Sequence, residues 1–155
     1  MKIGLGADHR GAASAQLLLD RLKALGHEVV ALSVLTGATS DYPLSAYTVG
    51  SALRRGEIER GVLICGTGIG MCIAANKIPG VRAALAHDEL SAEISRTHND
   101  ANILCLSADL LGQRLIEKMT ETWLVAPFQG GRHATRLNEI REIEAGRDPS
   151  LIAKS

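Results

Sequence analysis

The sequence predicts one α/β domain in which a five-stranded parallel sheet lies between two layers of helices, with an extra helix at the C-terminus. Short apolar runs alternate along the chain with segments of helical periodicity, as in folds built from repeated strand–helix units. Several of the runs are continuously apolar, which is typical of strands that are buried on both faces. A length of 155 residues suits one domain with its own core.

Five apolar runs predict the strands. Gly61–Cys65 is apolar without interruption, and Glu28–Val34 is rich in β-branched residues. Short runs of this kind, bounded by glycines and polar residues, favour strands over helices. The predicted strands are Lys2–Gly6, Glu28–Val34, Gly61–Cys65, Val81–Ala86 and Asn102–Leu106.

Helical periodicity or a helix boundary signal follows each strand. In Gly11–Leu25, apolar residues recur at helical spacing and Gly26 follows them. Pro43 suits a first helical turn, Asp88 can cap a helix, and Pro127 can end one. The predicted helices are Gly11–Leu25, Leu44–Arg55, Met71–Lys77, Asp88–His98, Asp109–Val125 and Arg132–Ala145.

Composition excludes several classes of protein. The chain has 17 basic and 17 acidic residues, and this balance argues against general nucleic-acid binding. No apolar segment is long enough for a signal peptide or a membrane span. Three cysteines without a CxxC pair predict neither a disulfide framework nor a metal site, and they favour a cytoplasmic protein. We expect the domain to cover residues 1–146 and a loose tail to follow at 147–155.

Two strand ends carry unusual residues. The first strand runs into Gly6-Ala7-Asp8-His9, and the third runs into the loop Cys65-Gly66-Thr67-Gly68-Ile69-Gly70. Ligands of open parallel sheets bind at this carboxyl edge, and glycines let backbone N–H groups approach an anion closely. The loop is equally compatible with a tight turn that binds nothing. Asp88 lies about 20 residues further on, the spacing of the acidic residue in dinucleotide-binding motifs, so a nucleotide site is an alternative interpretation.

Three further groups have both a structural and a chemical interpretation. Cys65 precedes a helix N-terminus, which favours a reactive thiolate, although a cysteine there is commonly a small buried hydrophobe. His98 and Asn99 could simply close a helix, with Asn99 in a left-handed turn. Arg132 and Arg136 share one helix face, which could be solvated or could bind a phosphate.

Taken together and in this order, six motifs carry a specific resemblance. They are Gly6-Ala7-Asp8-His9, Asp41-Tyr42-Pro43, Ile64 to Gly70, Ala74-Ala75-Asn76-Lys77, His98-Asn99-Asp100-Ala101-Asn102 and Gly130-Gly131-Arg132-His133. Over about residues 1 to 145 the chain resembles the type B ribose-5-phosphate isomerases and their galactose-6-phosphate isomerase relatives. The resemblance implies a Rossmann-like fold, an aldose–ketose isomerase for a phosphorylated sugar, no metal or organic cofactor, and a homodimer or dimer of dimers.

The resemblance also implies the roles of individual residues. The base that moves a proton between C1 and C2 falls on Cys65, and the residue that assists ring opening falls on His98. The implied substrate-binding positions are Asp8, His9, Tyr42, Gly66, Gly68, Ile69, Gly70, Asn99, Arg132 and Arg136. The chemistry agrees, because an enediol reaction needs one base and donors for a developing negative oxygen. Thr67 can hydrogen-bond the moving hydroxyl.

One position departs from the family pattern. Many members have a phosphate-binding arginine where this chain has Asp109. Asp109 either caps the following helix or indicates a substrate of different length. Ribose 5-phosphate is the expected substrate, and erythrose 4-, allose 6- and galactose 6-phosphate are alternatives. A nucleotide-binding module would not need Cys65, His98 and the two arginines together. A non-catalytic sugar-phosphate sensor would be expected to lose the base, and Cys65 is present.

The predicted topology separates the two catalytic residues. Cys65 ends the third strand, whereas His98 and Asn99 precede the fifth, and a strand of five residues spans about 16 Å. Within one chain these groups should therefore lie at opposite edges of the sheet. We expect active sites shared between two chains, with Cys65 and Asp8 from one and His98 and Asn99 from its partner.

Overall fold

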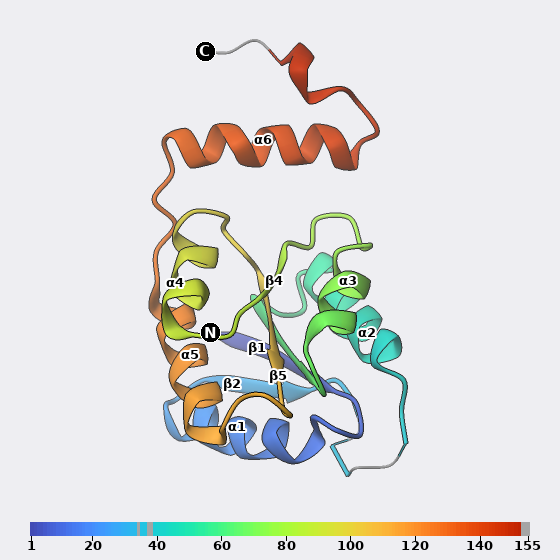
Figure 1. Ribbon diagram of the computed structural model, residues 1–155, viewed down its shortest axis with the longest axis vertical. Coiled ribbons are helices and arrows are strands. Elements are labelled where there is room, and N and C mark those ends of the chain that lie inside the picture. Colours follow the sequence, from blue (N-terminus) through green and yellow to red (C-terminus); the bar gives the residue numbers. More distant parts are fainter. Residues whose placement is uncertain (34, 37–38, 153–155) are drawn as a thin grey trace.

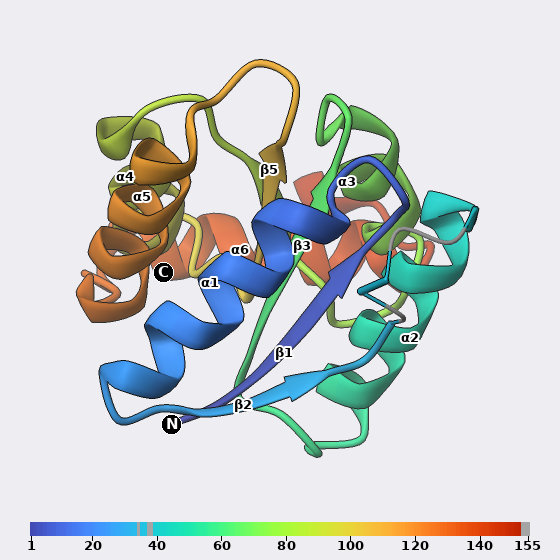
Figure 2. The same ribbon diagram turned by 90° about the horizontal axis from the view of Figure 1, so that it is seen from below.

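Five parallel strands form one sheet in the order β2-β1-β3-β5-β4 (Figures 1 and 2). The structure is a computed structural model that describes residues 1–33, 35–36 and 39–152. The strands are β1 (Lys2–Ala7), β2 (Glu28–Ala31), β3 (Arg60–Cys65), β4 (Ala83–Leu85) and β5 (Ile103–Ser107). The central strands β1, β3 and β5 are buried along almost their whole length, as continuous apolar runs predict.

Helices cover both faces of the sheet, so the predicted three-layer fold is confirmed (Figure 2). One layer holds α1 (Ala12–Ala24), α4 (Glu89–Thr97) and α5 (Gln113–Val125), and the other holds α2 (Tyr42–Arg54) and α3 (Ile69–Ala75). Each layer closes a hydrophobic core, the first around Leu18, Leu104 and Trp123 and the second around Leu63 and Met71. Within the described residues, no helix is both long and apolar enough to cross a membrane.

The last helix, α6 (Arg132–Glu144), lies beyond one end of the sheet rather than on a face (Figure 1). It crosses the loops that lead into β4 and β5. The backbone N–H of Gly80 donates to Glu144 Oε1 over 2.7 Å, and His133 and Leu137 are buried on the side that faces the loops. A short 3₁₀ turn, η1 (Pro149–Leu151), follows. The extra C-terminal helix therefore covers the amino edge of the sheet.

Most helix and strand boundaries agree with the sequence prediction to within two residues, and two differ more. β2 ends at Ala31, and Val34, its predicted end, lies outside the described residues. α5 begins at Gln113 rather than Asp109, because Gly112 occupies its N-cap and residues 108–110 are tied to the neighbouring loop. The helix-capping role predicted for Asp109 is therefore wrong. The division at residue 146 stays a prediction, and 153–155 lie outside the described residues.

Candidate active site

The loop between β3 and α3 is shaped by close packing of its glycines. Gly68 has φ +76°, in the left-handed region that favours glycine. A Cβ on Gly68 would lie 2.6 Å from Leu85 Cδ1, and one on Gly70 would lie 2.6 Å from Tyr42 Cε2. Glycine is therefore required at positions 68 and 70 because Leu85 and Tyr42 leave no room for a side chain there. The close approach at Gly70 also brings the Tyr42 ring, at the start of α2, against the loop.

Cys65 ends β3 with its sulfur directed at this loop. The residue is 4% exposed, and the Gly68 N–H donates to Cys65 Sγ over 3.1 Å. This hydrogen bond holds the sulfur against the backbone of the loop. Thr67 is exposed beside it, and its Oγ1 accepts from the Ile69 N–H over 3.3 Å. The loop therefore presents a thiol and an adjacent hydroxyl at the carboxyl edge.

The β1–α1 turn brings a carboxylate to the same edge. Asp8 is 6% exposed, and its Oδ1 accepts from the N–H groups of Arg10 and Gly11, each over 2.9 Å. The Asp8 N–H donates to Ile64 O over 3.3 Å, so the turn lies against the end of β3. His9 is exposed. Asp8, His9, Tyr42 and the residues of the 66–70 loop, namely Gly66, Thr67, Gly68, Ile69 and Gly70, therefore gather at one edge.

Asp109 belongs to this edge too, and it is not an isolated negative charge. Its Oδ2 accepts from Arg10 Nε over 2.9 Å and lies 2.7 Å from Arg10 Nη2. The Asp109 N–H donates to Gly66 O over 3.0 Å. The residue that departs from the family pattern is therefore paired with a cation from the β1–α1 turn.

His98 and Asn99 lie instead at the amino edge, below α6. The His98 ring stacks on the His133 ring, with centroids 4.2 Å apart and planes 9° from parallel. Burial, followed by the positive charges of His98, Arg132 and Arg136, lowers the pKa of His133. Asn99 is exposed and does not adopt the predicted left-handed turn: Asp100 does, with φ +46°.

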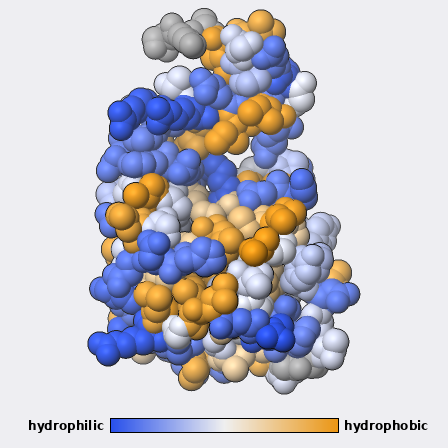
Figure 3. All heavy atoms as spheres, in the orientation of Figure 1, coloured by the Kyte–Doolittle hydropathy of each residue, from blue (hydrophilic) through white to orange (hydrophobic). Residues whose placement is uncertain are grey.

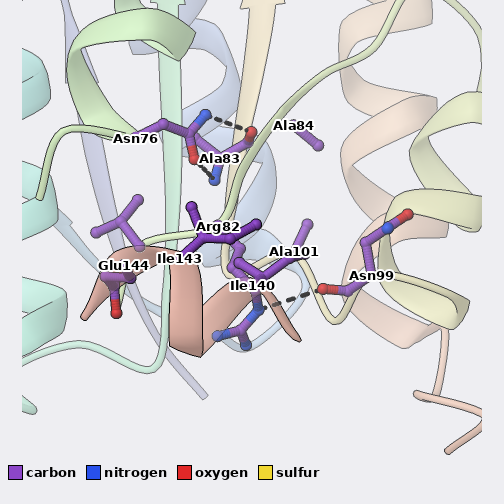
Figure 4. A pocket seen from close by; sticks show the side chains of 10 residues that line it. Asn76, Arg82, Ala83, Ala84, Asn99, Ala101, Ile140, Ile143 and Glu144 are labelled. Atoms are coloured by element: carbon purple, nitrogen blue, oxygen red, sulfur yellow. Dashed lines mark hydrogen bonds between the residues drawn. The ribbon is translucent and has the colours of Figure 1, made fainter. Parts of the chain in front are cut away.

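Two arginines hold the Asp100 turn. Arg82 Nη2 donates to Asp100 Oδ2 over 2.7 Å, and the buried Arg96 donates through Nη1 to Asp100 Oδ1 over 2.6 Å. Arg82 Nε also donates to the carbonyl oxygen of Asn99 over 3.2 Å (Figure 4). This ion-pair cluster fixes the backbone that carries His98 and Asn99. Sequence analysis did not find it, because Arg82 is 18 residues from Asp100.

A cavity of about 410 Å³ opens between this cluster and α6 (Figures 3 and 4). Asn99 and Arg82 supply polar groups to its wall, and Ile140 and Ile143 supply apolar ones. Figure 3 shows hydrophobic atoms along the side of α6 that faces the hollow. Arg132 and Arg136 are exposed at the start of the same helix.

The two groups of predicted residues are therefore separated within one chain. Cys65 pairs with Ser107 at the carboxyl end of β5, whereas Gly61 pairs with Ile103 at its start. The four residue steps from Gly61 to Cys65 span about 13 Å, and His98 lies before Ile103 in the chain. The chain thus brings Cys65, Asp8 and Tyr42 to one edge and His98, Asn99, Arg132 and Arg136 to the other.

The remaining cysteines differ from each other. Both lie in apolar segments, which favours a place in the core: Cys105 is fully buried, but Cys72 is only partly buried. A hydrogen bond with Cys105 lowers the pKa of Cys72 to about 7. The same hydrogen bond, together with burial, raises the pKa of Cys105. No group of three His, Cys, Asp or Glu side chains suited to a metal occurs in the part of the chain that the structure describes.

Known proteins match this arrangement over nearly the whole chain. Residues 3–140 match the family described as Ribose/Galactose Isomerase. The chain belongs to this family. It is similar to ribose-5-phosphate isomerase B of Escherichia coli K12, with 39% identity over 95% of this chain and 99% of that protein. The D-erythrulose-4-phosphate isomerase of Pectobacterium atrosepticum is 40% identical over 93% of this chain and 95% of that protein.

Solved structures of the same family agree with the fold. The ribose-5-phosphate isomerase B of Clostridium thermocellum superposes with a TM-score of 0.93 and 47% identity, covering 94% of this chain and 99% of that one. The type B enzyme of Trypanosoma cruzi gives a TM-score of 0.91 and 43% identity over 95% of this chain and 100% of that one. The protein is therefore an aldose–ketose isomerase of this family, and the predicted family and reaction class are confirmed.

Proposed function

We propose that the protein converts ribose 5-phosphate to ribulose 5-phosphate through an enediol, with Cys65 as the base. The observation that carries this proposal is the thiol held 3.1 Å from the Gly68 nitrogen at the end of β3. The ribose-5-phosphate isomerase B names of several relatives support the choice of substrate.

The reaction needs three proton transfers. The Cys65 thiolate takes the proton from C2 of the open-chain aldose, and the electrons of that C–H bond form the C1–C2 double bond while O1 becomes negative. A proton moves from O2 to O1 past the Thr67 hydroxyl. The Cys65 thiol then returns its proton to C1, which leaves the ketone at C2. Backbone N–H groups of the 66–70 loop stabilise the negative oxygen of the intermediate.

We further propose that a second chain completes the site. His98 opens the sugar ring, Asn99 binds hydroxyls, and Arg132 and Arg136 bind the phosphate, all from the partner of a homodimer. Exposed apolar side chains on α2 and α3 support this assembly, because they flank the Cys65 loop and suit a protein interface. They are Leu44, Tyr47, Ile69 and Ile73, which are 49% to 66% exposed.

Mixing two inactive variants tests the shared site. Cys65→Ala chains and His98→Asn chains are each expected to lose most turnover of ribose 5-phosphate, by about 10²- to 10⁴-fold for loss of a general acid or base. In a mixed dimer one site contains both intact residues, so activity recovers toward half of the wild-type value per heterodimer. Absence of recovery, in dimers shown by mass spectrometry to contain both chains, would refute the proposal.

Two controls separate chemistry from folding and from ring opening. Cys72→Ala should retain turnover, because Cys72 lies on α3 away from the proposed reacting carbons. Erythrose 4-phosphate cannot close a furanose ring through its phosphorylated terminal oxygen. The His98→Asn variant should therefore lose much less activity with this sugar than with ribose 5-phosphate, and equal losses would contradict the ring-opening role.

A four-carbon sugar phosphate is the second candidate substrate. The observation that favours it is Asp109, which stands where many family members have an arginine and pairs here with Arg10. The Pectobacterium relative is named for D-erythrulose 4-phosphate, and its 40% identity equals that of the ribose-5-phosphate isomerase B of Listeria innocua. Comparing kcat/KM for the two sugar phosphates decides between the candidates.

A further inference from the structure

Arg10 occupies a place in the candidate site that neither the family motifs nor the proposed mechanism uses. It lies in the β1–α1 turn, directly after Asp8 and His9, and its side chain extends over the loop that follows Cys65. A Cβ on Gly66 would lie 3.0 Å from Arg10 Nε and 2.8 Å from Asp109 Oδ2. The ion pair is therefore in direct contact with the backbone of the catalytic loop.

The geometry of the pair leaves part of the guanidinium free for a ligand. Nε and Nη2 both point to a single oxygen, Asp109 Oδ2, over 2.9 and 2.7 Å. A guanidinium has five N–H donors in a rigid plane, so the ion pair with Asp109 uses the donors on only one side of the guanidinium. The Arg10 side chain is 58% exposed at this edge. The remaining donors are thus accessible to an anion that enters the site.

The position of Asp109 is itself fixed, so the orientation of Arg10 is fixed as well. The Asp109 N–H donates to Gly66 O over 3.0 Å, and the Ser107 hydroxyl donates to the same oxygen over 2.6 Å. The hydrogen bond to Asp109, followed by the negative charges of Asp109 and Asp8, raises the pKa of Arg10. Without Arg10, two carboxylates would face an incoming phosphorylated substrate.

We propose that Arg10 is a substrate-binding residue that donates hydrogen bonds to the phosphoryl group of the sugar phosphate, and that Asp109 positions its guanidinium. This assignment rests on the proposed function, since it places the phosphoryl group of that substrate beside the loop of Cys65. It supplies a cation from the chain that carries the thiol, in addition to Arg132 and Arg136 of the proposed partner. An exposed ion pair stabilises a fold little, so its effect should be on binding.

Arg10→Ala tests the assignment against a matched control on the same helix layer. Arg21 forms a similar exposed pair, with Nε 2.7 Å from Glu121 Oε1, but lies near the other end of α1. For Arg10→Ala we expect KM for ribose 5-phosphate and the inhibition constant for inorganic phosphate to rise about tenfold or more, as for loss of a charged hydrogen bond, with kcat within about threefold. Arg21→Ala should change none of these.

Two double variants distinguish a direct contact between Arg10 and the phosphate from simple neutralisation of the Asp109 charge by Arg10. Arg10→Ala with Asp109→Asn removes both charges, and phosphate affinity should stay low if Arg10 contacts the ligand. Recovery to the wild-type value would overturn the proposal, because Arg10 would then only mask the carboxylate. Arg10→Ala with Asp109→Arg places a guanidinium at the same spot from the other element, so it should bind phosphate better than Arg10→Ala alone. Failure to do so would also count against the proposal.

Calorimetric titration with inorganic phosphate makes the outcome independent of turnover. If the wild-type protein does not isomerise ribose 5-phosphate, the proposed function fails, but phosphate binding and its loss in Arg10→Ala can still be measured. If the wild-type protein isomerises the sugar and Arg10→Ala keeps its KM and phosphate affinity, only the role of Arg10 fails. Arg10→Gln, of similar length, and thermal melting of each variant exclude misfolding as the cause of a loss.

Discussion

The two edges of the sheet are built by different physical means. At the carboxyl edge, glycines allow close packing: Gly11 and Gly68 lie against the backbone of neighbouring strands, and Gly66 lies against the Arg10–Asp109 ion pair. At the amino edge, side-chain charges hold the chain, with Asp100 in a left-handed conformation between Arg82 and Arg96. The carboxyl edge therefore depends mainly on the space that glycines leave, with one exposed ion pair between Arg10 and Asp109, whereas the amino edge depends on a cluster of opposite charges.

This difference determines how each edge should fail. A close approach of backbones has no alternative arrangement, so an added methyl group must displace a strand or a helix. An ion-pair cluster can lose one member and be partly resolvated, and its strength depends on protonation. We therefore expect steric substitutions to act most severely at the carboxyl edge. Charge changes and pH should act mainly at the amino edge.

Gly11→Ala should have the largest effect. A Cβ at Gly11 would lie 2.1 Å from Ile64 O, a backbone atom near the carboxyl end of the central strand β3. We expect a loss of about 3 kcal/mol or more in the free energy of unfolding, at the upper end for overpacking. Urea denaturation measures it. Gly112→Ala is the matched control, because a Cβ there meets nothing within 4 Å. Equal stability of the two variants would show that the β1–α1 turn can move.

Asp100→Ala should have an intermediate effect at the amino edge. It leaves Arg96, which is 5% exposed, without its carboxylate. Breaking a partly buried pair of this kind should lower the free energy of unfolding by about 2 to 3 kcal/mol. Glu57→Ala breaks the exposed pair of Glu57 with Arg55 and should cost less than about 1 kcal/mol. Chemical denaturation compares the two, and a loss no greater than that of Glu57→Ala would contradict a structural role for the cluster.

The same contrast explains how much of the molecule could be predicted from its sequence. The strands, the helices and the glycine-rich loop at Cys65 are encoded locally, in apolar periodicity and in glycines between a strand and a helix. Their order along the chain also sufficed to place Cys65 and His98 at opposite edges, since all strands are parallel. The candidate residues of the carboxyl edge could therefore be found before the structure.

The long-range contacts that hold the amino edge could not be predicted in this way, although its Arg96–Asp100 pair joins residues only four apart. Arg82 and Asp100 are 18 residues apart, and the His98–His133 stack joins segments 35 residues apart, so no local pattern indicates either contact. The Arg10–Asp109 pair spans 99 residues. Capping of the following helix was one of two interpretations of Asp109, because aspartate is a common N-cap, but the residue instead pairs with Arg10 of the β1–α1 turn.

The smallest expected effect is a pH dependence that belongs to the amino edge. The pKa of His133 is lowered in the folded chain by burial and by His98, Arg132 and Arg136, so the unfolded chain binds this proton first as the pH falls. Because the unfolded state then holds more protons, the free energy of unfolding decreases as the pH falls below the ordinary histidine pKa of about 6.5, and it increases again as the pH rises through that value.

His133→Phe keeps an aromatic ring for the stack on His98 and removes the titration. The decrease in melting temperature from about pH 8 to about pH 5 should therefore be smaller in His133→Phe than in the wild type or in His27→Phe, a control between α1 and β2. An identical pH profile in all three proteins would mean that His133 is not held in its neutral form, and that the amino edge is no more sensitive to charge than the carboxyl edge.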